Sequence, residues 1–182
     1  ITYAKGGAVL GMLEAWIGPD RFRRGLAAYM KERRMSNATA GDLWFHMARH
    51  TGQPVAEVAA SWTNQPGLPL ISATTVCESG TTVLNLHQSR FAMGEPLAGG
   101  PWPVPVRVVR GSEERTLMLN ATAGRYELPG CLEAPLRANA GGLGYYVVAY
   151  DATQRAQLAA AFSTLPPADR VALLSDTWGT IA

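Results

Sequence analysis

The sequence predicts a multi-domain chain of the α + β class, with a helical block, a β block and a shorter helical block. As far as Trp62, apolar residues recur at helical spacing. After the turn signal Gln65-Pro66-Gly67 they alternate with polar residues, which is typical of strands. The helical spacing returns from Thr153. We therefore expect three domain segments, at residues 1–68, 69–151 and 152–182.

The first block divides into several consecutive helices. Gly18-Pro19-Asp20 separates the first two, because Gly and Pro interrupt a helix and Asp20 can cap the next one. Thr39-Ala40-Gly41-Asp42 has the form of a capping box, in which Thr39 and Asp42 satisfy free backbone amides of the third helix. Gly52 is placed to end that helix, and Pro54 suits the first turn of a fourth.

Period-two alternation predicts the strands of the β block. In the segment that begins at Val104, apolar and polar residues alternate, as in a sheet with one dry and one wet face. Short strands at this spacing favour a small antiparallel sandwich. The predicted strands are Leu70–Val76, Thr81–Gln88, Val104–Arg110, Arg115–Asn120 and Tyr145–Tyr150, with weaker candidates at Tyr126–Leu128 and near Leu136.

Two short helices close the sequence, and Pro166-Pro167 separates them. Their apolar residues, such as Leu158 in the first and Leu174 in the second, recur at helical spacing. Alone, two such helices would have little to pack against, so we interpret them as the start of a further helical domain.

Composition limits the classes of partner. Charged residues make up 16% of the 182 residues, and the net charge is only +2. Because so small a charge creates no long-range field, we expect no nucleic acid and no anionic membrane as partners. No apolar run is long enough for a membrane segment, and no targeting signal is evident. Since Ile1 is not an initiator Met, we expect the chain to be cut from a longer one.

His46 and His50 are the first candidates for chemistry. They lie four residues apart on one face of the third helix and could both bind one zinc ion. The H-E-x-x-H motif of zinc peptidases, however, needs a Glu after the first His, and Met47 stands there. The alternative is two partly exposed histidines near a helix C-terminus, where the helix dipole favours a cation. We therefore expect no metal ligand in this chain.

Cys77 and Cys131 are the only cysteines. They could pair if the protein is exported, or be small buried residues if it is not. Neither lies in a basic motif that would predict a reactive thiolate.

The opening of the chain, from Ile1 to Leu13, resembles the zinc aminopeptidase family of aminopeptidase N and puromycin-sensitive aminopeptidase. In that family a Tyr, one further residue and Lys-Gly open the helix after the zinc ligands, as Tyr3, Lys5 and Gly6 would here. Further landmarks follow in family order over essentially the whole chain. They are Gly25 with Tyr29, Asn37-Ala38-Thr39 with Asp42-Leu43-Trp44, Trp62 through Pro69, Gln88 through Phe91, Trp102 through Pro105, Asn139 through Tyr146, Tyr150, and Arg170 with Leu173-Leu174 and Asp176-Thr177-Trp178.

The resemblance implies both a fold and a function. Residues 1–68 would be the helical tail of a thermolysin-like catalytic domain, 69–151 a β-sandwich, and 152–182 the start of a helical C-terminal domain. In the family, a zinc ion held by H-E-x-x-H and a later Glu activates water to hydrolyse the N-terminal peptide bond of a peptide. None of those ligands occurs here. We therefore expect zinc in the parent protein only, and no activity from this chain alone.

Tyr3 matches the family's catalytic tyrosine, whose phenol donates a hydrogen bond to the oxyanion of the reacting carbonyl. Without the resemblance, a tyrosine before a helix is more often packed than catalytic. Two positions depart from the family: Ala4 replaces the commoner acidic residue, and Val147 replaces an Arg that often follows the Tyr-Tyr pair. The alternative function is a non-catalytic interaction module from a zinc-less relative, which would keep the fold and not the role of Tyr3.

Overall fold

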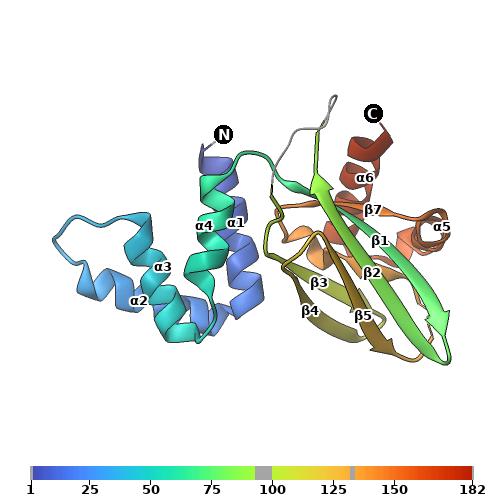
Figure 1. The fold of residues 1–182 in the computed structure, drawn as a ribbon, viewed down its shortest axis with the longest axis horizontal. Coiled ribbons are helices and arrows are strands. Elements are labelled where there is room, and N and C mark those ends of the chain that lie inside the picture. Colours follow the sequence, from blue (N-terminus) through green and yellow to red (C-terminus); the bar gives the residue numbers. More distant parts are fainter. Residues whose placement is uncertain (1, 93–99, 132–133, 182) are drawn as a thin grey trace. The chain divides into compact units, whose positions relative to one another are not determined.

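The computed structural model describes residues 2–92, 100–131 and 134–181 (Figure 1). Its class is α + β, as predicted. The contacts divide the chain into two compact units, Ile1–Pro66 and Gly67–Ala182, named here the helical unit and the mixed unit. Ile1 and Ala182, the outer limits of the predicted domain segments, lie outside the described residues. The division into three domains stays a prediction.

The helical unit is built from α1 (Thr2–Ile17), α2 (Pro19–Glu32), α3 (Ala40–Thr51) and α4 (Val55–Asn64). Helix α3 packs against α2 and α4, and α1 packs against α2 and α4. The apolar residues that recur at helical spacing supply the core, as expected for amphipathic helices. The buried side chains of this core include Val9, Met12, Leu13, Ile17, Met47, Val55, Val58 and Trp62.

Local sequence sets the helix boundaries. The predicted capping box of Thr39 and Asp42 is present at the start of α3, and Gly52 ends α3 in the left-handed conformation. The prediction that Asp20 caps α2 is wrong. Because Pro19 already occupies the first helical position, Asp20 lies inside the first turn, where it pairs with Arg23.

The mixed unit contains two sheets, with strand orders β5-β2-β1-β7 and β4-β3-β6. Each of the seven predicted strand regions forms a strand, although β7 begins later than predicted. The strands are β1 (Pro69–Glu78), β2 (Thr81–Arg90), β3 (Val104–Arg110), β4 (Glu113–Leu119), β5 (Ala123–Pro129), β6 (Leu136–Ala138) and β7 (Val147–Tyr150). Side chains from both sheets are buried, among them Ile71, Leu84, Leu86, Val106, Leu119 and Val148.

One strand pairing differs from the predicted antiparallel arrangement. Strands β1–β2, β2–β5, β3–β4 and β3–β6 are antiparallel, but β7 pairs with β1 in parallel, with Leu70 opposite Val147. The chain reaches β7 from β6, which belongs to the other sheet, through the short helix η1 (Ala140–Gly142). The chain therefore enters β7 without a tight turn from a neighbouring strand of the same sheet, so no hairpin requires β7 to run antiparallel to β1.

The mixed unit ends in α5 (Ala152–Ala160), η2 (Phe162–Thr164) and α6 (Pro167–Ile181). Asp151 caps α5 by accepting a hydrogen bond from the backbone of Gln154. Helix α6 packs against η1 and β7 (Figure 1). No helix within the described ranges has the length and apolar character needed to cross a bilayer.

Candidate functional site

Tyr3 lies in the first turn of α1, and 96% of its side chain is exposed. Two residues later, the Nζ atom of Lys5 donates a 2.9 Å hydrogen bond to the backbone oxygen of Gln65, just after α4. This bond connects the start of α1 to the end of α4. The phenol of Tyr3 therefore projects from a helix end that is anchored within the helical unit.

An open hollow of about 460 Å³ lies along the same end of α1. Its lining comes from α1, α3 and α4, and comprises Lys5, Gly6, Val9, Leu10, Leu43, Trp44 and Thr63. A Cβ atom added to Gly6 or Gly7 would meet no atom within 4 Å. Both glycines are exposed, so they leave the backbone of α1 accessible near its start.

The two histidines do not form a metal site with other described residues. His46 is buried on α3, with its ring edge-on to Tyr29 and Phe45, and its Nε2 atom lies 3.6 Å from a carboxylate oxygen of Glu32. His50 is exposed. The interpretation of both as partly exposed histidines is wrong for His46, because α2 packs over it. No group of three or more potential ligands occurs within the described ranges.

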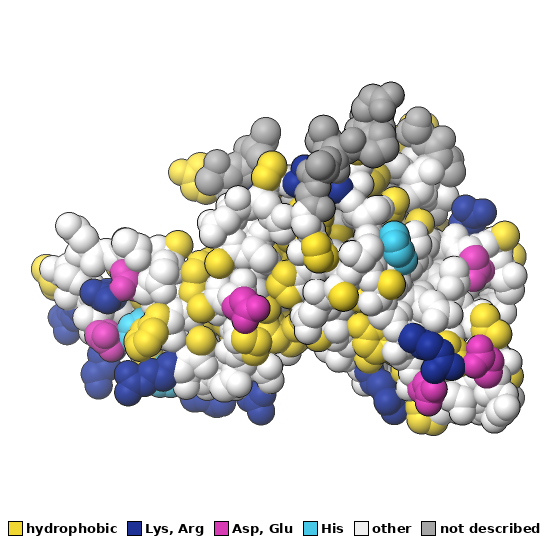
Figure 2. All heavy atoms as spheres, viewed as in Figure 1, with side chains coloured by type: hydrophobic (Ala, Val, Ile, Leu, Met, Phe, Trp, Pro, Cys, Tyr) yellow, Lys and Arg dark blue, Asp and Glu magenta, His cyan; other side chains and the backbone are white. Residues whose placement is uncertain are grey.

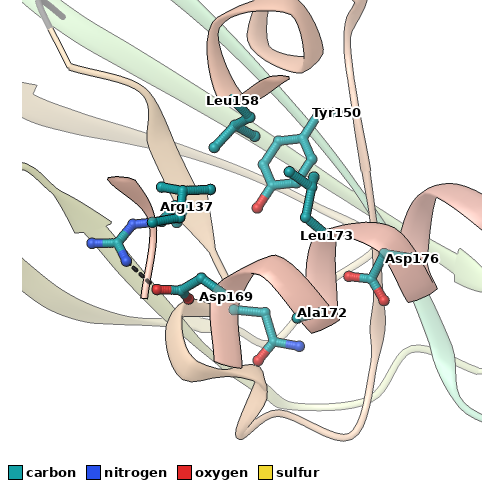
Figure 3. A pocket seen from close by; sticks show the side chains of 9 residues that line it. Arg137, Tyr150, Leu158, Asp169, Ala172, Leu173 and Asp176 are labelled. Carbon is teal, nitrogen blue, oxygen red and sulfur yellow. Dashed lines mark hydrogen bonds and ion pairs between the residues drawn. The ribbon is translucent and has the colours of Figure 1, made fainter. Parts of the chain in front are cut away.

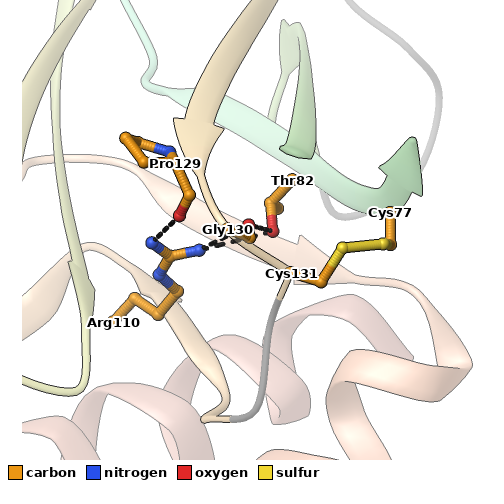
Figure 4. The surroundings of a disulfide bond; sticks show 6 residues. All are labelled: Cys77, Thr82, Arg110, Pro129, Gly130 and Cys131. Carbon is orange, nitrogen blue, oxygen red and sulfur yellow. Dashed lines mark hydrogen bonds between the residues drawn. A yellow bond between two sulfur atoms is a disulfide. The ribbon is translucent and has the colours of Figure 1, made fainter. Parts of the chain in front are cut away.

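Cys77 and Cys131 form a disulfide, so they are paired and are not the small buried residues of the alternative. The bond joins the end of β1 to the segment after β5, and both residues are exposed (Figure 4). A disulfide-bonded cysteine offers no thiolate, so neither residue is a nucleophile while the bond is intact.

Arg110 connects the two sheets beside this disulfide. It extends from β3 and donates hydrogen bonds to the backbone oxygens of Pro129 and Gly130, and to the hydroxyl of Thr82 on β2 (Figure 4). Its guanidinium also pairs with Glu113 at 2.6 Å. The planar guanidinium group can serve several acceptors at once, which suits this position. Sequence reasoning missed Arg110, because its acceptors are mostly backbone oxygens about 20 residues away, which leave no pattern.

A second polar cluster holds α6 against the rest of the mixed unit (Figure 3). Asp169 pairs with Arg137 of β6 and accepts a 2.6 Å hydrogen bond from the backbone of Gly141. Two turns later, Asp176 accepts a 3.1 Å hydrogen bond from the backbone of Val148. Thus two carboxylates on one face of α6 bind the backbone of η1 and β7.

Burial perturbs the acids of this cluster. It raises the pKa of Asp176 to about 6, and the bond from Val148 offsets only part of that effect. Burial also raises the pKa of Tyr150, whose hydroxyl accepts a 2.8 Å hydrogen bond from the backbone of Ala138. The cavity between these groups measures about 20 Å³, which is space for one water molecule. A site of this size suits a structural role rather than substrate binding.

Gln88 and Trp102, two of the landmarks quoted above, have structural contacts. The side-chain amide of Gln88 exchanges hydrogen bonds of 2.9 Å with the backbone of Trp102 in both directions. It also donates to the backbone oxygen of Ala121 at 2.8 Å. Arg90 lies 5.6 Å from the centre of the Trp102 ring. These contacts connect β2 to the segment before β3.

Comparisons with known proteins relate the chain to peptidases. Residues 1–62 match the family described as Peptidase family M1 domain. Aminopeptidase M1 of Arabidopsis thaliana is 35% identical over 98% of this chain, and Aminopeptidase N of Lactobacillus helveticus is 32% identical over 97%. Tricorn protease-interacting factor F2 of Thermoplasma acidophilum is 30% identical over 98%.

This similarity covers a limited part of each relative. The chain spans about a fifth of their length, namely 22%, 21% and 21% in the same order. On this chain the match extends over nearly the whole length, as the ordered landmarks predicted. The similarity therefore confirms the resemblance inferred from the sequence: the chain belongs to the M1 family of peptidases.

Proposed function

We propose that this chain is part of a zinc-dependent aminopeptidase, which hydrolyses the N-terminal peptide bond of peptides, and that Tyr3 is one of its catalytic residues. The observation that carries the proposal is the position of Tyr3, exposed at the anchored start of α1 beside an open hollow. The alignment with relatives named as aminopeptidases supports the same assignment.

The chemistry assigned to Tyr3 is hydrogen-bond donation. When water attacks a peptide carbonyl, negative charge develops on the carbonyl oxygen, and a donor placed to meet that oxygen lowers the barrier. A phenol supplies one O–H donor. Since 96% of the Tyr3 side chain is exposed, its hydroxyl is accessible to a carbonyl that approaches from outside the helical unit.

The described residues of this chain do not fit a zinc ion. The two candidate histidines differ in burial, and no third ligand joins them in the described ranges. In the proposal, zinc is held by parts of the parent protein that this sequence does not include. The contribution of this chain is then the donor Tyr3 and the surface on which it stands.

The proposal extends to the architecture of the parent protein. Residues 1–68 are assigned to the helical tail of a thermolysin-like catalytic domain and 69–151 to a β-sandwich. Residues 152–182 are assigned to the first part of a helical C-terminal domain. The exposed apolar side chains Val171, Leu174 and Trp178, which recur along α6, support the last assignment, because they offer a face on which further helices can pack.

The test is the substitution Tyr3→Phe in the full-length parent protein. Loss of one oxyanion donor costs about 10²–10³ in kcat, so turnover of an aminoacyl substrate should fall by that factor. Zinc content and KM should stay close to wild type. Tyr126→Phe is the matched control, because that hydroxyl donates to the backbone of Met118 in the mixed unit, at 2.9 Å.

Two results would contradict the proposal. Wild-type turnover in Tyr3→Phe would remove Tyr3 from the mechanism. A parent protein whose sequence before Ile1 lacks H-E-x-x-H, and which shows no turnover, would instead be the non-catalytic interaction module.

A further inference from the structure

The hairpin of α2 and α3 carries a basic surface that the proposed function does not use. Residues 21–34 include six basic residues and one acidic residue, a net charge of +5 in a chain whose total is +2. Arg21, Arg24, Lys31 and Arg34 are all exposed. In Figure 2, Lys and Arg side chains gather along the edge of the helical unit formed by α2 and the turn after it.

Exposed apolar side chains lie among these cations. Leu26 is 38% exposed and Met30 61% exposed. Successive residues of a helix are turned by about 100°, so Leu26 and Met30 lie along one side of the outward face of α2, and Arg24 and Lys31 lie along its other side. The opposite side of α2 carries Gly25, which is buried against α3. The outward face of α2 is therefore both cationic and apolar.

Met35 extends this face into the turn after α2. Its side chain is 97% exposed, and its φ of 60° lies in the left-handed region that a side chain with a Cβ disfavours. The turn is well connected: the backbone of Ser36 donates to the oxygen of Arg33 at 3.1 Å, and Arg33 pairs with Asp42. The fold thus holds an apolar side chain in water on a strained backbone, which points to a use outside the fold.

We propose that this basic–apolar face, defined by Arg24, Leu26, Met30, Lys31, Arg34 and Met35, binds peripherally to a membrane surface rich in anionic phospholipids. In this arrangement the basic side chains lie at the level of the lipid phosphates, and Met30 and Met35 enter the boundary between the headgroups and the acyl chains. Long basic side chains suit this arrangement, because their stems can lie in the apolar layer while their charges stay in water.

A lipid surface fits these observations better than an acidic protein segment. An acidic segment offers charge to the arginines, but it offers no apolar layer to Met30 and Met35. The proposal differs from the expectation drawn from the net charge of the whole chain. The chain total is small because acidic residues elsewhere balance the hairpin, whereas a surface a few ångströms away responds to the local charge.

The experiment is cosedimentation of the 182-residue chain with vesicles. We expect binding to phosphatidylcholine vesicles that contain phosphatidylserine, little binding to pure phosphatidylcholine, and release as salt is raised. The double substitution Lys31→Glu with Arg34→Glu should lower the partition coefficient at least about tenfold. Arg115→Glu with Arg155→Glu in the mixed unit makes the same change in net charge and should leave binding near wild type.

Met35→Gly separates binding from folding. Glycine adopts a positive φ without strain, so this variant should unfold at a higher temperature than wild type. It should nevertheless bind the anionic vesicles several-fold more weakly, because the inserted side chain is gone. A loss of binding in a more stable variant cannot be attributed to misfolding.

Four outcomes would overturn the proposal. They are failure to bind the anionic vesicles, equal binding to neutral vesicles, equal losses in the hairpin and control double variants, and unchanged binding by Met35→Gly. If, in addition, soluble polyglutamate displaces the chain and Met35→Gly has no effect, the face is a site for an acidic protein segment.

Discussion

The disulfide gives the most quantitative prediction. Replacing Cys77 and Cys131 together by Ser removes a crosslink between residues 54 positions apart. In the chain-entropy model, a closed loop of that length stabilises the folded state by about 4 kcal/mol, because it restricts the unfolded chain. Both residues are exposed, so the substitution leaves no cavity and no buried polar group. The loss of stability should therefore arise almost entirely in the unfolded state.

The assay is urea unfolding of wild type and the double variant. With an m value of about 2 kcal/mol/M, a loss of about 4 kcal/mol lowers the midpoint of the mixed unit by about 2 M. Tryptophan emission, to which Trp102 contributes from its buried position in that unit, reports the transition. Wild-type protein in dithiothreitol is the control and should unfold like the variant. A midpoint within about 0.5 M of oxidised wild type would refute the reasoning.

Three further predictions concern packing and charge. Asp176→Asn should raise stability at pH 7 by about 1–3 kcal/mol and flatten its pH dependence. The pKa of Asp176 is about 6 in the folded chain and 3.8 ordinarily, so the folded state binds the proton more tightly. The wild type therefore loses stability as the pH rises from about 4 to about 6. Urea midpoints measured across this pH range check the prediction, and parallel curves for the two proteins would contradict it. Gly25→Ala should destabilise the helical unit by about 1–3 kcal/mol, since the new Cβ would lie 2.7 Å from Met47 Sδ and 3.2 Å from Met47 Cα. Thermal unfolding measures the loss. Gly11→Ala is the control, because its new Cβ would meet no atom within 4 Å. Thr39→Ala should cost about 1 kcal/mol through loss of the capping box, and an unchanged melting temperature would show that the cap is not needed.

Sequence patterns predicted the local features of the fold and missed those that depend on distant pairing. The capping box of Thr39 and Asp42 could be recognised because its hydrogen bonds span three residues. The pairing of β7 with β1 could not be recognised, because alternation of apolar and polar residues specifies which face of a strand is buried and not which strand lies beside it. The burial of His46 was missed for a similar reason: its cover is α2, whose packing angle no local pattern encodes.

The candidate site was only partly predictable. Residue chemistry alone gave Tyr3 no role, and the family resemblance supplied one. The pairing of Cys77 with Cys131 stayed open at the sequence level, because it depends on the segment after β5 reaching the end of β1. The ion pair of Arg137 and Asp169 was not predicted, because 32 residues separate the two and their contact forms only when α6 packs against the rest of the mixed unit.

The parallel pairing of β1 with β7 also constrains how the chain can fold while it is being synthesised. Leu70 lies opposite Val147, so β1 cannot pair along this edge until β7 has been synthesised. During translation β1 and β2 can form their hairpin early, but the open edge of β1 stays unpaired until the ribosome has released residues near Tyr150. Such an edge is a template for pairing with other nascent chains. Chaperone capture of ribosome-bound chains that stop before β7 would therefore be greater than that of chains that extend beyond it.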